Sequence, residues 1–188
     1  MAKTARDMVL SLVALIVVLI ALGSLGRGCA FSPGGPKVDP KAVPTVDQHA
    51  ELRDAAGIVG FPVRDPNAPA GWRVNSAQTA ATPSGASSVQ VGWLTAGGRY
   101  LRLAQSSAPL DELVRFEGGL DRNAAVPADG SLQVAGRTWT GYPGQHDERA
   151  WATDLDGVRV LITGSGTQDE VRALASAVQD STVLPSTR

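Results

Sequence analysis

Three segments of the chain carry apolar residues at the three- and four-residue spacing of a helix that buries one face. The first covers 46–59 and has Gly57 as a typical stop near its end. In the second, which follows Pro109 and ends at a Gly-Gly pair, the helical spacing is traced by Leu110, Leu113, Val114 and Glu117. The third opens with Thr-Gln-Asp-Glu at 167–170. This is a capping box, in which the threonine hydroxyl and the glutamate carboxylate accept from free backbone N–H groups.

Between these helices, apolar and polar residues alternate with the two-residue period of half-buried strands. The segment 61–72 holds three prolines and predicts a loop, after which a strand begins at Trp72. The predicted hairpins are 89–103 with its turn at 96–99, 132–142 with its turn at 135–136, and 151–163 with its turn at 156–157. Asp-Gly at 156–157 is typical of a type I′ turn.

The order of these elements is helix, strands, helix, strands, helix. Because hairpins make most of the connections, the sheet is predicted to be antiparallel, with one face available to about three helices. The predicted fold class is therefore α+β.

A different pattern precedes this domain, because residues 8–26 form an uncharged, almost entirely apolar run. About 20 apolar residues cross the ~30 Å hydrocarbon core of a bilayer, and no polar stripe typical of a core helix interrupts this run. We therefore expect a transmembrane helix that lies in the lipid bilayer. Basic residues flank it almost equally, so the short N-terminal tail decides the expected topology: a single-pass plasma membrane protein with a cytosolic N-terminus and an extracytoplasmic domain.

Two other fates of this segment stay open. A basic start, an apolar stretch and the small residues around Cys29 also describe a cleaved signal peptide, although the run exceeds the usual 7–15 apolar residues. Lipidation of Cys29 is the second alternative, but Arg27 directly after the apolar run argues against it. A retained signal-anchor is the favoured interpretation.

Composition and charge divide the chain further. Residues 31–44 contain four prolines and two glycines, which predicts an extended linker between the anchor (1–30) and the domain (45–188). The domain carries 12 arginines and 16 acidic residues, a net charge of −4, whereas the first 44 residues carry +3. Nucleic acid is not expected as a partner, because binding it needs a concentrated basic face. The lone cysteine, Cys29, precedes the domain, which therefore has no disulfide.

For each polar motif in the domain, we favour a structural role over a role in catalysis or ligand binding. The glycines at 164–166 precede a helix, where phosphate can bind, but the lysine of a P-loop and the third glycine of a dinucleotide fingerprint are missing. His146 lies beside Asp147 and Glu148, a composition that suits acid–base catalysis and equally a solvated loop. The two histidines, with no cysteine in the domain, also make a zinc site improbable.

Asp154 and Asp156 flank Leu155 beside a turn and, being two residues apart on a strand, could share a face, as paired catalytic or cation-binding carboxylates do. Polar residues beside a turn are the favoured interpretation. We therefore assign no catalytic residue, no metal ligand and no cofactor, and we do not expect an enzyme.

The tryptophans are the remaining candidates for a site. Strand tryptophans line apolar pockets and partner-binding faces, and they also form cores under helices. The predicted ligand or partner face consists of whichever are exposed among Trp72, Trp93, Trp139 and Trp151.

Taken together, the pattern resembles a known family. Arg6-Asp7-Met8 with Ser11-Leu12 opens the apolar helix, the Pro-rich linker follows, Gly71-Trp72 enters the first strand, and a capped helix closes the domain. In these features the chain resembles an actinobacterial family of single-pass membrane proteins, the domain of unknown function family 4245. The resemblance implies a membrane location and supplies no catalytic residues. The order of strands and helices also resembles the Mog1/PsbP-like fold, an analogy that says little about function.

Three functions remain as hypotheses. The first is a membrane-anchored cell-envelope protein whose domain binds a ligand or a protein partner. The second is an extracytoplasmic hydrolase, which would need His146, Asp154 and Asp156 to converge in one cleft. The third is an accessory subunit of a membrane complex, which would dock through its apolar helix.

Overall fold

The computed structural model describes residues 9–10, 12–15 and 46–186. The chain divides into two units, residues 1–43 and 44–188. In the first unit, Val9, Leu10 and residues 12–15 are helical and exposed. The linker, Cys29 and most of the expected anchor at 8–26 lie outside the described residues. Within the described part, no helix has the length and apolar character needed to cross a bilayer.

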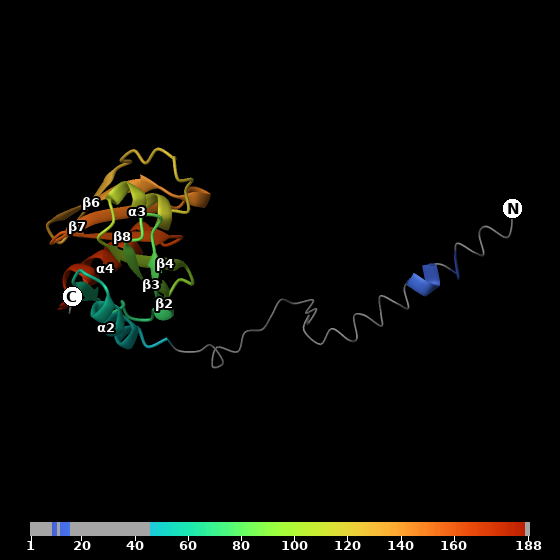
Figure 1. Ribbon diagram of the computed structural model, residues 1–188, viewed down its shortest axis with the longest axis horizontal. Coiled ribbons are helices and arrows are strands. Elements are labelled where there is room, and N and C mark those ends of the chain that lie inside the picture. Colours follow the sequence, from blue (N-terminus) through green and yellow to red (C-terminus); the bar gives the residue numbers. More distant parts are fainter. Residues whose placement is uncertain (1–8, 11, 16–45, 187–188) are drawn as a thin grey trace. The chain divides into compact units, whose positions relative to one another are not determined.

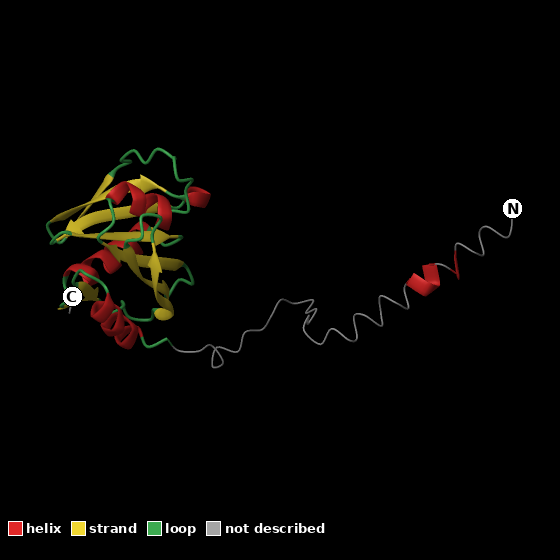
Figure 2. Ribbon diagram, in the orientation of Figure 1, coloured by secondary structure: helices red, strands yellow, loops and turns green. Residues whose placement is uncertain are grey.

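The second unit is built on a seven-stranded sheet in which every neighbouring pair is antiparallel (Figures 1 and 2). Its strands are β2 (Arg73–Ala81), β3 (Ser87–Leu94), β4 (Tyr100–Ser106), β5 (Ser131–Val134), β6 (Arg137–Pro143), β7 (Arg149–Leu155) and β8 (Val158–Gly164). They lie in the order β2-β3-β4-β8-β7-β6-β5. The main helices are α2 (Gln48–Ile58), α3 (Leu110–Glu117) and α4 (Gln168–Gln179). The predicted α+β class with an antiparallel sheet is confirmed.

Local sequence signals produce these elements as expected. Asp156 and Gly157 have φ of 59° and 85°, the left-handed backbone that the β7–β8 turn needs. The capping box of α4 is present, since the Thr167 hydroxyl accepts from the Glu170 N–H and the Glu170 carboxylate accepts from the Thr167 N–H. These contacts satisfy backbone groups at the helix N-terminus and fix where α4 begins.

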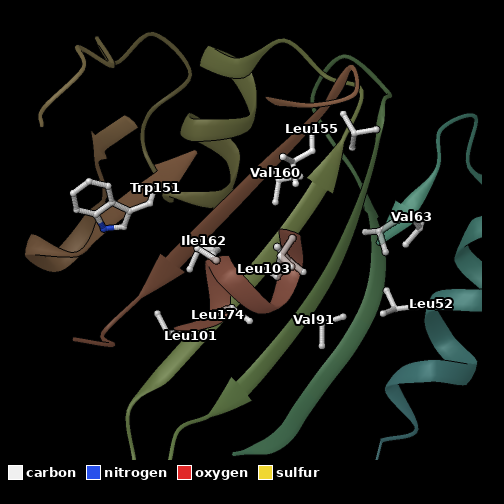
Figure 3. Close-up of a cluster of buried hydrophobic side chains, with 14 of the residues drawn as sticks. Leu52, Val63, Val91, Leu101, Leu103, Trp151, Leu155, Val160, Ile162 and Leu174 are labelled. Atoms are coloured by element: carbon white, nitrogen blue, oxygen red, sulfur yellow. The ribbon is translucent and has the colours of Figure 1, made fainter. Parts of the chain in front are cut away.

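The two faces of the sheet carry separate clusters of buried apolar side chains. The larger cluster lies between the sheet and the helices α2 and α4, and Figure 3 shows Leu174 of α4 with Leu103 and Ile162 of the sheet. The smaller cluster lies under α3. It consists of Ala104, Leu113, Val114, Ala150, Ala152 and Leu161. Alanines under α3 allow the helix to approach the strands closely.

Two short strands differ from the prediction of a loop at 61–72 and of a helical end to the chain. β1 (Val63–Asp65) and β9 (Thr182–Leu184) pair with each other and form a second, two-stranded sheet. Each has only three residues, so neither displays enough alternation to be recognised locally. They become a sheet only because the fold brings the two ends of the domain together.

Candidate functional site

A buried ion pair lies between α3 and the sheet. The apolar stripe of α3 passes through Leu113 and Val114, and one turn later the same stripe places Glu117 against the strands. The Glu117 side chain is only 1% exposed, and its Oε2 lies 3.1 Å from Nε of Arg102 on β4. A carboxylate is seldom buried so fully unless it is paired, because burial removes its hydration.

Two further side chains hold the same carboxylate. The Ser88 hydroxyl and the Gln90 amide, both on β3, each donate to Oε1 of Glu117 over 2.7 Å. Ser88 and Gln90 are two residues apart, so they project from the same face of the sheet. The orientation of Glu117 is therefore determined from two strands at once.

The Arg102 guanidinium is oriented in turn by Glu117. Its Nη2 donates to the Glu117 carbonyl oxygen over 2.7 Å, so the Nε–Nη2 edge faces the end of α3. Within the described part of the chain, Nη1 has no hydrogen-bond partner, and the side chain remains 29% exposed. Arg102 thus presents its outer edge to solvent from a fixed position.

Arg102 lines a pocket of about 360 Å³, which is within the ~300–1,000 Å³ range of small-molecule sites. The floor comes from β4 and the end of β8, and the walls come from the C-terminal end of α3 and from the short 3₁₀ helix η1 (Gln145–Asp147) with the residue after it. The principal lining side chains are Tyr100, Arg102, Phe116, Gln145, His146, Glu148 and Thr163.

The wall around η1 is held in an unusual backbone conformation. His146 and Asp147 have φ of 55° and 60°, and each such non-glycine residue costs about 1–2 kcal/mol. The Gln145 N–H donates to the Gly118 carbonyl over 3.0 Å, and the Gln145 amide donates to the Gly119 carbonyl. These bonds fasten the wall to the end of α3. Backbone strain of this kind is concentrated at functional sites.

A second hollow of about 510 Å³ lies next to the first and shares His146 and Glu148 with it. Trp151 lines it, with the Arg149 guanidinium 5.9 Å from the ring centroid. The N-terminus of α4 also borders it, but Glu170 already occupies that position. Hydrogen bonds from Thr95 and Thr167 hold the pKa of Glu170 below its ordinary value. The capping box therefore engages the Thr167 and Glu170 N–H groups at this helix N-terminus without a phosphate.

A larger open groove of about 640 Å³ runs along the other side of α3. Three of its four charged residues are already engaged: Arg115 donates to Asp111, and Glu112 accepts from the Ser84 N–H over 3.0 Å. The hydrogen bonds from Arg115 and from Thr82 lower the pKa values of Asp111 and Glu112, respectively. Arg122, the fourth charged residue of the groove, is exposed, and no hydrogen bond or ion pair among the described residues orients it. Arg102 is oriented by Glu117, so the Arg102 pocket is the stronger candidate.

The four tryptophans are distributed between core and surface. Trp93 and Trp139 are fully buried, and the Trp93 indole N–H donates to the Gln48 amide oxygen over 3.0 Å. Trp72 is half-buried against the same core. Trp151, which Figure 3 shows at one end of the α2/α4-side cluster, is 6% exposed and lines the second hollow.

The structure separates the polar residues that a hydrolase would need to bring together. His146 precedes β7, whereas Asp154 and Asp156 lie at the opposite end of that strand. Asp154 accepts from the Gly157 N–H, and Asp156 pairs with Arg64 over 2.8 Å. His49 pairs with Asp65, also over 2.8 Å. Among the described residues, no three His, Cys, Asp or Glu side chains are grouped closely enough to hold a metal ion.

Comparison with known proteins identifies the family of this chain but assigns it no function. No curated protein and no solved structure matches this chain. A family model described as "Protein of unknown function (DUF4245)" matches residues 1–178, which is almost the whole sequence. The chain therefore belongs to this family of unknown function.

Proposed function

We propose that this protein is a membrane-anchored component of the cell envelope whose domain binds a small polar ligand beside Arg102. The anchor is proposed from the uncharged run at 8–26, which has the length of a bilayer-spanning helix. The single observation that supports ligand binding is the position of Arg102, because Glu117 holds one edge of the guanidinium while the partly exposed side chain lines a pocket.

Binding is a better match to this pocket than hydrolysis. A general base needs a lone pair directed at its substrate, but Glu117 is almost completely buried. Its Oε1 accepts hydrogen bonds from Ser88 and Gln90, and its Oε2 lies in an ion pair with Arg102. Glu117 is therefore a positioning residue for Arg102. An oriented arginine is a recognition group, since it remains charged and offers several N–H donors in a rigid plane.

Location and binding require separate experiments. For location, the domain should be digested by protease once only the outer envelope layers are opened, and mass spectrometry should find residues 1–30 still attached. Protection of the domain until the plasma membrane is lysed would reverse the proposed topology. For binding, ligand-observed NMR on the full chain in detergent micelles should detect small polar compounds. Arg102→Lys should weaken that binding, whereas a chain with no detectable ligand would contradict the proposal.

A further inference from the structure

We infer that the pocket beside Arg102 binds a neutral, hydroxyl-rich ring, a saccharide, with the outer edge of the Arg102 guanidinium donating to two hydroxyl oxygens on adjacent ring carbons. This inference rests on the proposed function and specifies its ligand class. It depends on three properties of the pocket: its charge balance, the direction of its donors and its aromatic walls.

The charge balance disfavours a charged ligand. The lining contains one permanent cation, Arg102, and two carboxylates, Glu117 and Glu148. Because Glu117 already neutralises Arg102 at 3.1 Å, an added anion would meet a lining whose remaining charge is negative. An added cation would have to lie beside the N–H groups of the Arg102 guanidinium, whose positive partial charges repel it even though Glu117 balances the net charge. A hydroxyl group avoids both problems, since it accepts from a guanidinium and donates to a carboxylate at the same time.

The direction of the donors suits neighbouring oxygens. With the Nε–Nη2 edge turned to Glu117, the remaining Nη1–Nη2 edge carries two nearly parallel N–H groups, which match a pair of oxygens a short distance apart. Thr163 is the cross-strand partner of Arg102 in the β4–β8 ladder and adds a hydroxyl to the same floor. The half-buried Glu148 on the facing wall supplies an acceptor.

The walls add a partly apolar surface. Phe116 and Tyr100 are both half-buried and both line the pocket. A saccharide ring combines polar edges with faces made of C–H groups, so it can use the aromatic side chains and Arg102 together. Pockets that combine aromatic walls with a few placed polar groups are typical of small-molecule sites. The volume of about 360 Å³ suits a small ligand.

The test uses the full chain in an amine-oxide detergent, because detergents with sugar headgroups would compete. Saturation-transfer NMR would compare two panels: methyl glycosides of the common hexoses with N-acetylglucosamine, and the small carboxylates acetate, succinate and benzoate. At least one saccharide should receive saturation, and the carboxylates should not. Arg102→Lys should weaken saccharide binding about tenfold, because lysine lacks the two-pronged donor edge. Arg73→Lys, on an exposed arginine of β2, should leave binding unchanged.

A second variant keeps the test valid if Arg102→Lys fails to fold. Glu148→Ala removes a side chain that lines the pocket and should weaken saccharide binding severalfold. Glu51→Ala, at an exposed position of α2 outside the pocket, should leave saccharide binding unchanged. Saturation of carboxylates alone would overturn the saccharide assignment and leave the proposed binding function standing. Saccharide binding that is equally strong in the wild-type chain, Arg102→Lys and Glu148→Ala would overturn the assignment to this pocket. Binding of neither panel, with a folded chain, would contradict the saccharide inference; if further polar compounds also fail, the proposed function falls with it.

Discussion

The two faces of the sheet use the same strands for different purposes. On the α2/α4 face, β4 contributes Leu101 and Leu103 to a large apolar cluster. On the α3 face, the residue between them is Arg102, and it joins a buried network of Glu117, Ser88 and Gln90. Alternation along one strand thus separates an apolar face that stabilises the fold from a face that carries the buried polar network and the proposed ligand pocket.

The difference follows partly from helix length. α4 has 12 residues and α2 has 11, whereas α3 has only 8 and ends at Gly118. A short helix leaves the start of β4 and the end of β8 beyond its C-terminal end, and the pocket lies there. Four substitutions test the contrast between the faces, from the largest expected effect to the smallest.

The largest effect is expected on the apolar face. Leu103→Ala removes a side chain with no exposed surface and leaves a cavity under α4, so the free energy of unfolding should fall by about 3–5 kcal/mol. Urea denaturation of the full chain in detergent would measure this. A decrease in unfolding free energy below ~1 kcal/mol would mean that neighbouring side chains fill the cavity and that the apolar cluster is loosely packed.

Next in size is the loss of the cation on the polar face. Arg102→Met leaves the Glu117 carboxylate buried with neutral donors alone, and we expect a loss of about 2–3 kcal/mol. The value is smaller than for a fully buried pair, since Arg102 is partly exposed. Adding Glu117→Gln to the same chain should restore much of the stability, because the amide oxygen still accepts from Ser88. A double variant as unstable as the single one would show that buried charge is not the cause.

A smaller effect is expected where β2, β3 and β4 meet on the α3 side. The Tyr100 ring lies over Gly92, and a Cβ added there would lie 2.7 Å from the Ser76 hydroxyl oxygen and 2.8 Å from Cε2 of Tyr100. Gly92→Ala should therefore cost about 1–3 kcal/mol. Gly57→Ala is the matched control, since a Cβ there meets nothing within 4 Å and alanine favours the helix by ~0.5–1 kcal/mol. Equal changes in the free energy of unfolding for Gly92→Ala and Gly57→Ala would contradict the close approach of the Tyr100 ring to Gly92.

The smallest effect concerns the capping box of α4. Hydrogen bonds from Thr95 and Thr167 lower the pKa of Glu170, so its ionised form is favoured by folding. Its contribution is present above the unfolded pKa of ~4.3 and is lost as pH falls through the lower folded pKa. Glu170→Gln should therefore destabilise the chain by ~0.3–1 kcal/mol at pH 7, and the difference should narrow below pH ~4. A difference that is constant with pH would exclude the charge as its source.

Much of this architecture is predictable from local pattern. The helices α2, α3 and α4 and the hairpins around 135–136 and 156–157 follow from spacing, capping and turn chemistry, because each signal acts within a few residues. β1 and β9 are missed because their pairing joins opposite ends of the domain. The buried pair is also long-range, yet a signal for it exists: Glu117 continues the apolar stripe of α3, and a carboxylate in such a position demands a cation. Nothing in the sequence identifies Arg102 as that cation.

The pairing of β1 with β9 also constrains how the domain is made. Val63 lies opposite Leu184, so β1 cannot pair until a segment far later in the chain has been synthesised. Contacts between such distant residues form late, since closing long loops costs entropy before the contact stabilises anything. During synthesis the nascent domain therefore cannot complete its fold from the N-terminus onward. Loss of β9 would leave β1 without its pairing strand, even though every strand of the large sheet was present.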